Sequence, residues 1–124
     1  MSFRILSLFL GQILTKNTMT KKKITSFGEY IRQLRESAEL PLRKVAAQLD
    51  IDPSLLGKIE RNERQPTKEV IDGIAKVFNQ DAKYLHMEYL SDQIAYKILD
   101  EEANIDILKV AEKKVEYLKA NRNK

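Results

Sequence analysis

The chain has 124 residues, of which 22 are lysine or arginine and 18 are aspartate or glutamate, so its formal net charge is +4. This mild excess permits a polyanionic partner without requiring one. There is no cysteine, which excludes disulfides, thiolate metal sites and thiol catalysis. The length suits one domain with an appended segment, and the excess of positive charge lies in residues 1–85.

Residues 1–23 differ in character from the rest of the chain. Apolar residues dominate positions 3–14, but this run is too short to span a bilayer and lacks the flanks of a signal peptide. A run of three lysines follows at 21–23, which is either a solvated arm or an arm that lies along a phosphate backbone. We expect residues 1–23 to be a disordered leader or basic arm, the native product to start at Met19, and the protein to be cytoplasmic, with no membrane contact.

The first two helices are predicted from caps and apolar spacing. Ser26 and Glu29 form a capping box, which predicts a helix from Phe27 to about Ser37. A proline break follows, and a second helix is predicted over about 42–49.

The third predicted helix, about residues 53–61, follows a very short turn. Asp52 is suited to be its N-cap, and Pro53 fits the first helical position, where a proline loses no intrahelical hydrogen bond. A short helix, a tight turn and a capped second helix form the helix-turn-helix pattern. Residues 45–61 are therefore predicted to form a helix-turn-helix, the central feature of the chain.

Two more helices are predicted before residue 87. Thr67 is the expected N-cap of the fourth and Asp81 of the fifth. No segment shows the alternation of apolar and polar residues that is typical of strands. The fold class is therefore all-α.

Residues 88–121 predict a C-terminal helical extension. Apolar residues recur at helical spacing, and a polar break at 100–104 separates two candidate helices. The second set approaches the a/d seam of a coiled coil. Such a stripe must be covered, either by the core of the same chain, by a second copy or by a protein partner. Its apolar residues are Leu90, Ile94, Ile98, Leu99, Ile105, Leu108, Ala111, Val115 and Leu118.

Enzymatic chemistry has little support in the sequence. His86 is the single histidine, and the four glycines are scattered at 11, 28, 57 and 73, so no phosphate-binding loop is present. We expect no catalytic residue, no metal site and no cofactor.

Several motifs together resemble a known family. They are Ile31-Arg32, Leu34-Arg35, Val45-Ala46, Ile51-Asp52-Pro53-Ser54-Leu55-Leu56, Lys58-Ile59-Glu60-Arg61 and Pro66. In this spacing, residues 24–87 resemble the XRE/Cro-type, lambda-repressor-like DNA-binding domains. The resemblance implies a five-helix helix-turn-helix bundle whose third helix enters the major groove, here followed by the C-terminal helical extension.

The resemblance also implies a set of site residues. Base edges would be met by Pro53, Ser54, Leu55, Gly57 and Lys58. Phosphates would be met by Arg43, Lys44, Arg61, Asn62 and Arg64, and a structural ion pair would join Arg35 to Glu60. The chain departs from the family at Leu42, where glutamine is frequent, at Asp50, where glycine is usual, and at Gly57, where serine is common.

The expected function is a sequence-specific transcriptional regulator, a repressor or autoregulator, which binds double-stranded DNA as a homodimer on an inverted repeat. One alternative is an antitoxin-type interaction module, in which residues 88–121 bind a partner toxin. A restriction–modification controller is a third role.

Overall fold

The computed structural model describes residues 24–122, and this part of the chain consists of six helices. The expectations for the leader, the lysine run and the start at Met19 lie outside the described residues. The predicted all-α class is confirmed for residues 24–122, which contain no strand. The helices are α2 (Phe27–Ser37), α3 (Leu42–Leu49), α4 (Pro53–Glu60), α5 (Lys68–Val77), α6 (Ala82–Asp100) and α7 (Ile107–Arg122).

The predicted caps account for most of the helix starts. The capping box of Ser26 and Glu29 is complete, with each side chain accepting from the other residue's backbone N–H. The side chains of Asp52 and Thr67 accept from backbone N–H groups in the first turns of α4 and α5. Asp81 occupies the N-cap position of α6, but its side chain makes no capping hydrogen bond, so that expectation is only half met.

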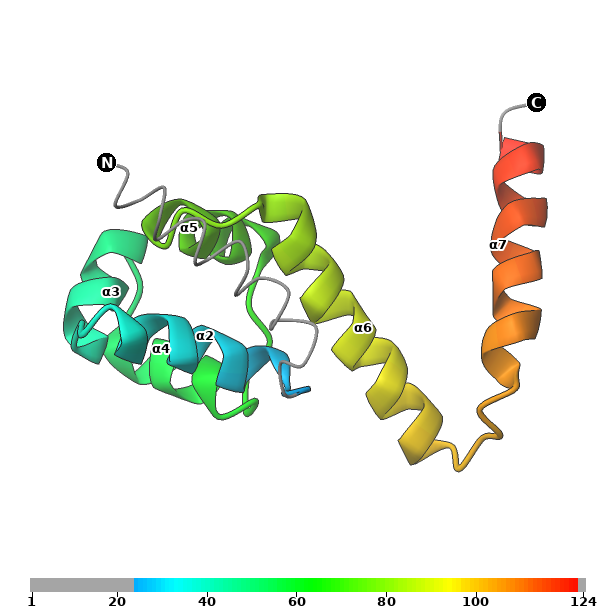
Figure 1. Cartoon of the computed structure of the whole chain (residues 1–124), viewed down its shortest axis with the longest axis horizontal. Helices are drawn as coiled ribbons and strands as arrows, with labels where there is room; N and C mark the ends of the chain where they lie inside the picture. The colour runs from blue at the N-terminus through cyan, green and yellow to red at the C-terminus, as the bar shows by residue number, and fades with distance from the viewer. Residues whose placement is uncertain (1–23, 123–124) are drawn as a thin grey trace, which may run out of the picture.

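Helices α2 to α5 and the first turns of α6 enclose the hydrophobic core (Figure 1). Helix α4 lies across α2 and α3, and α5 packs on α3 and α6. The largest side chains with almost no exposure are Ile31, Val45, Leu56, Ile59, Ile71, Ile74 and Leu85. Five helices thus bury one face each, as amphipathic helices of a small bundle must.

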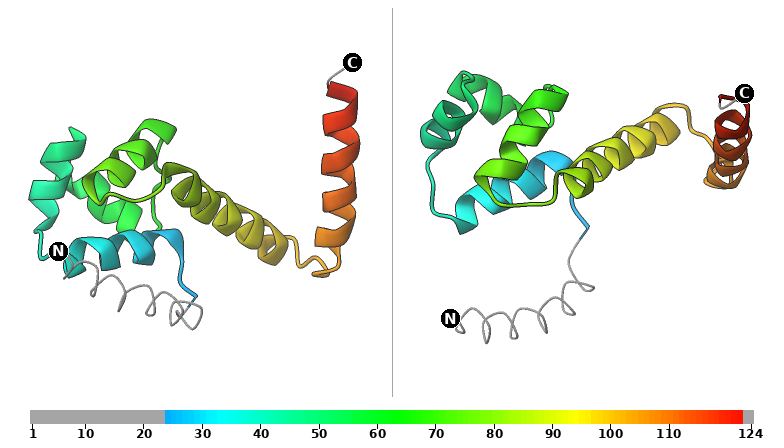
Figure 2. Two further views of the ribbon diagram at one scale, coloured as in Figure 1. Left: turned by 45° about the horizontal axis from the view of Figure 1, so that its top comes forward. Right: turned by 90° about the horizontal axis from the view of Figure 1, so that it is seen from above.

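Helix α6 continues well beyond the predicted five-helix unit. It runs unbroken from Ala82 to Asp100, so the expected domain boundary between 87 and 88 lies inside a helix. The polar break expected at 100–104 begins at the last residue of α6 and continues into the segment between α6 and α7. Figures 1 and 2 show α6 leading away from the bundle and α7 turning back from its far end in an open V.

Helix α7 has no buried residue. Among residues 24–122, no helix combines the length and the apolar character needed to cross a bilayer.

Candidate nucleic-acid interface

The turn between α3 and α4 fixes the position of α4. Val45 and Ala46 of α3 and Leu56 of α4 are fully buried against each other and form the smaller of two core clusters. Asp50 ends α3 with φ 57° and ψ 45°, the left-handed conformation that glycine usually supplies at this point. The core contacts and this corner set α4 as the second helix of a helix-turn-helix unit.

The outward face of α4 carries Ser54 and Lys58, which are four residues apart and therefore on the same side of the helix. Both side chains are exposed, as is Pro53 at the helix start. Lys58 forms no ion pair among the described residues. Its ammonium can thus donate to an external acceptor.

The hydroxyl of Ser54 is committed in one direction. Its Oγ and its backbone N both donate to Oδ1 of Asp52, each at 2.9 Å. These two hydrogen bonds, the backbone one first, hold the pKa of the Asp52 carboxyl below its usual value. With its proton used in this way, the hydroxyl has only lone pairs left to offer a ligand.

Two of the residues expected to read bases face inward to different degrees. Leu55 is half-buried and packs against the main core cluster, which leaves part of its side chain exposed. Gly57 is buried, and a Cβ added to it would lie 3.5 Å from Cδ2 of Leu42 and 3.2 Å from Nη1 of Arg61. Gly57 therefore packs near the start of α3, and the base contact expected for it stays a prediction.

The start of α3 presents cationic side chains beside free backbone donors. Arg43 and Lys44 are exposed and form no ion pair within residues 24–122. The N-cap residue Pro41 has no side-chain acceptor, and the N–H groups of Leu42 and Arg43 make no hydrogen bond in the described part of the chain. Unsatisfied N–H groups at a helix start, next to positive side chains, suit a phosphate.

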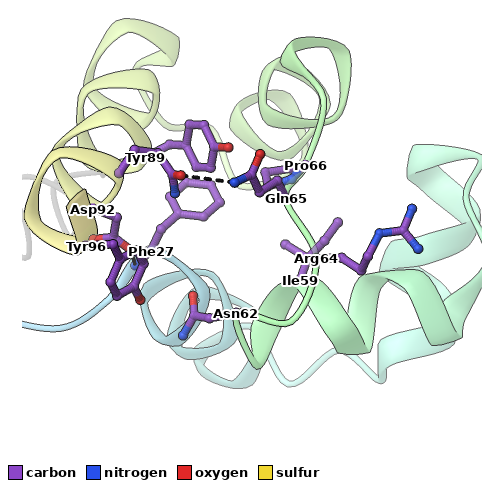
Figure 3. A pocket seen from close by; sticks show the side chains of 10 residues that line it. Phe27, Ile59, Asn62, Arg64, Gln65, Pro66, Tyr89, Asp92 and Tyr96 are labelled. Atoms are coloured by element: carbon purple, nitrogen blue, oxygen red, sulfur yellow. Dashed lines mark hydrogen bonds between the residues drawn. The ribbon is translucent and has the colours of Figure 1, made fainter. Parts of the chain in front are cut away.

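Arg61 ends α4 in contact with an acidic neighbour. Its Nε and Nη2 donate to the two carboxylate oxygens of Glu63 at 3.1 and 3.3 Å, and both side chains are more than half exposed. The pairing lowers the pKa of Glu63 and raises that of Arg61. A phosphate contact of Arg61 would thus compete with Glu63. Arg64 is exposed and has no such partner in the described residues, and Figure 3 shows its side chain pointing away from the other residues of the pocket.

Asn62, for which a phosphate contact is expected, also has a structural task. It follows α4 in the left-handed conformation, with φ 61°. Its Oδ1 accepts from the N–H of Gly28 at 3.0 Å, and its Nδ2 donates to Oγ of Ser26 at 2.9 Å. Asn62 therefore clamps the α4–α5 loop to the first turn of α2, while the second N–H and the second lone pair of its amide leave the phosphate contact as a prediction.

Arg35 and Glu60 join α2 to α4 in a bidentate ion pair. Nε of Arg35 lies 2.7 Å from Oε2 of Glu60, and Nη2 lies 3.0 Å from Oε1. The remaining nitrogen, Nη1, donates to the carbonyl of Leu40 at 3.0 Å. The hydrogen bond to Glu60 raises the pKa of Arg35. The side chains are only 14% and 5% exposed, so this pair joins the last turn of α2 to the end of α4 and is not available to DNA.

Helix α6 supports the loop that follows α4. The ring of Tyr89 meets Phe27 edge-on at 5.5 Å between centroids, and Oδ2 of Asp92 accepts from the Phe27 N–H at 2.7 Å. Gln65 in the loop donates to the side chain of Gln93 at 3.1 Å (Figure 3). These residues surround a pocket of about 110 Å³ between α2, the loop and α6.

Sequence reasoning missed these supporting residues of α6. They lie 65 residues from Phe27 and 28 from Gln65, and no local pattern signals a contact of that range. The available signal was the apolar spacing of Leu85 and Tyr89, which continues the buried face of α6 past residue 87.

The comparisons with known proteins agree with this geometry. Residues 31–85 match the profile of a family described as "Helix-turn-helix". An "uncharacterized HTH-type transcriptional regulator" in each of two strains of Mycobacterium tuberculosis is 32% identical over 60 residues. The matched part is 48% of this chain and 43% of each relative, so the chain spans less than half the length of the curated relatives it matches. No solved structure gives a significant match.

Proposed function

We propose that residues 31–85, which match a helix-turn-helix family profile, form a DNA-binding domain of the XRE type, and that the protein is a sequence-specific transcriptional regulator that binds double-stranded DNA as a homodimer. It would act in the cytoplasm by occupying its operator, as a repressor or autoregulator, and not by catalysis. The observation that carries the proposal is the exposed face of α4, where Ser54 and Lys58 project beside unpaired cations at the start of α3.

In this arrangement, residues of α4 would read the bases and other residues would bind the phosphates. Lys58 would donate to O6 or N7 of a guanine. The Ser54 hydroxyl donates its hydrogen bond to Asp52, so only its lone pairs remain for a base. It would therefore accept from an amino group, N6 of adenine or N4 of cytosine. Pro53 and the exposed part of Leu55 would contribute apolar contacts, for which a thymine methyl is the fitting partner.

Phosphate contacts would fix the register of the domain on the duplex. Arg43 and Lys44 flank the free amides of α3, and Arg64 extends from the loop after α4. Arg61 would join them on release from Glu63. With few base-reading side chains per copy, two half-sites would supply much of the specificity.

The test is a footprint on the DNA upstream of the protein's own gene and on random DNA, each at several salt concentrations. The proposal predicts a protected, symmetric site and an affinity that falls steeply as salt rises. Binding that is equal on random DNA at every salt concentration would contradict sequence-specific regulation.

An antitoxin-type module remains the second candidate, and the apolar residues exposed on α6 and α7 favour it as a general surface for protein contacts. In that case a toxin encoded next to this gene would co-purify with the full chain. A restriction–modification controller would differ only in the identity of the regulated genes.

A further inference from the structure

An apolar trough runs along α6 on the side away from Phe27 and Asp92. A hollow of about 660 Å³ lies between α5 and α6, and a second of about 480 Å³ lies between α6 and α7. Ser91 and Ile94 line both hollows, so the two are continuous. Leu90 and Leu99 on its walls are 56% and 70% exposed. The described part of the chain leaves this trough open.

Helix α7 has an apolar face that nothing in the described part of the chain covers. It has 16 residues, none buried, and it packs on no other helix through more than marginal contact. Helices of this length are marginal in water unless an apolar face is covered. Leu108, Ala111, Val115 and Leu118 form such a face at steps of three and four residues.

The shapes of the trough and the stripe fit each other. Ser91 and Ala95, one turn apart on α6, give the trough a floor of small side chains over which another helix can approach closely. Figures 1 and 2 show α6 and α7 diverging, so α7 of the same chain borders the trough at its base and does not lie along it. A helix from another molecule has room to enter.

We propose that the trough of one copy is filled by α7 of a second copy, and reciprocally, so that two α6 and two α7 helices form a four-helix bundle. This deepens the homodimer of the proposed function and rests on it. A symmetric exchange is self-complementary, as closed dimers require.

The available apolar surface is large enough for a dimer. Six half-exposed side chains on each copy would lose on the order of 100 Å² each on contact, or about 600 Å² per partner before any polar rim, against roughly 800 Å² per partner in a standard interface. They are Leu90, Ile94, Leu99, Leu108, Val115 and Leu118, which are 42–70% exposed. Neither α6 nor α7 contains a long block of like charges that would oppose the contact.

Single cysteines test the exchange directly, because the chain contains none of its own. A tagged Ala95→Cys chain, marked in the trough, is mixed with an untagged Ala111→Cys chain, marked on the α7 stripe, and treated with a short bismaleimide reagent. The proposal predicts an efficient mixed crosslink between the two chains. A Lys113→Cys chain is the matched control, since position 113 is two residues further on and faces away from the stripe.

A second arrangement is tested by the double variant Ala95→Cys/Ala111→Cys. Crosslinks confined to single chains would show α7 folded back on its own α6 and overturn the proposal. Equal yields from Ala111→Cys and Lys113→Cys would also overturn it, because the contact would then be unspecific.

The oligomeric state gives an independent readout without DNA. Sedimentation equilibrium of the full chain is expected to give twice the mass of one chain, and Val115→Glu is expected to give one chain while its circular dichroism stays largely helical. A dimer that survives Val115→Glu would place the interface elsewhere. Because no DNA is present, failure of this proposal and failure of the regulator assignment remain distinguishable: a Val115→Glu monomer would still bind single half-sites weakly.

Discussion

The carboxylate of Asp92 accepts a 2.7 Å hydrogen bond from the backbone N–H of Phe27, which ties the middle of α6 to the first turn of α2. This contact makes residues beyond 87 part of the helical bundle that contains the helix-turn-helix. The acceptor also places a negative charge at the N-terminal end of a helix, where the helix dipole favours it.

Replacing this acceptor should weaken the domain. We expect Asp92→Ala to lower the free energy of unfolding by about 1–2 kcal/mol, because a partly buried N–H group loses its partner and a favourable charge is removed. Asp92→Asn keeps an acceptor and should lose less. Urea unfolding followed by circular dichroism measures both, and equal losses in the two variants would contradict a role for the hydrogen bond.

The buried ion pair predicts a different pattern of loss and recovery. Glu60→Leu should cost about 3–5 kcal/mol, because Arg35 would remain charged in a site that is nearly closed to water. The double variant Arg35→Met/Glu60→Leu should recover much of this stability, since no unpaired charge stays behind. A double-mutant cycle measured by urea unfolding checks the coupling. Additive losses in the double variant would show that the pair is not coupled.

Two glycines should respond to alanine in opposite ways. At Gly28 a Cβ would lie 2.5 Å from the carbonyl oxygen of Glu60 and 2.6 Å from that of Ile59, so Gly28→Ala should destabilise by about 1–3 kcal/mol or more. At Gly57 the nearest atom is the mobile Nη1 of Arg61, and alanine should gain up to about 1 kcal/mol of helix propensity. Thermal unfolding of both variants decides this.

The Gly57→Ala variant also tests whether that residue only packs or also approaches a base. If Gly57 is a packing position, operator affinity should be unchanged within a factor of about two. A large loss of operator affinity without a loss of stability would support the base contact expected for Gly57.

Base reading and phosphate anchoring should separate in two further variants. Lys58→Ala is expected to lose about 1–3 kcal/mol on the operator and to relax sequence preference at one position, because a specific donor is removed. Arg43→Ala should weaken operator and random DNA alike and reduce the salt slope by about 1. Titrations at several salt concentrations measure both. Unchanged preference in Lys58→Ala would refute the assignment of α4 as the recognition helix.

One tyrosine should titrate late. Its hydrogen bond to the carboxylate of Glu88, helped by burial, raises the pKa of Tyr84 to about 12. A raised folded-state pKa means that this contribution to stability is complete below pH 10 and is lost as the pH rises toward 12. Absorbance at 295 nm should therefore show a late phase that Tyr84→Phe removes and Glu88→Gln moves back toward pH 10. A late phase that persists in Tyr84→Phe would contradict this origin.

The local elements of this fold could be predicted from sequence because their signals are local. A capping box, an Asp-Pro start and apolar spacing located α2 to α5. The polar break between α6 and α7 could likewise be predicted, because it consists of consecutive, mostly polar residues.

The tertiary roles were not predictable in this way. The phosphate contact of Asn62 was expected only because the family resemblance places this position beside a phosphate. Only the structure shows both of its polar ends engaged on α2, 34 and 36 residues away. Gly57 likewise has no side chain whose direction a pattern could predict, and its burial depends on where Leu42 packs.

Because α6 is unbroken, its length fixes the distance between the helix-turn-helix bundle and the apolar trough. Leu85, deep in the core of the bundle, and Ile94, in the trough, lie on one continuous helix. A helix turns by about 100° and rises 1.5 Å per residue, so one residue inserted between them would swing the recognition face around the axis of the bundle. In a dimer joined through the trough, the phase and spacing of the two operator half-sites would therefore be encoded in the length of α6, separately from the residues that read the bases.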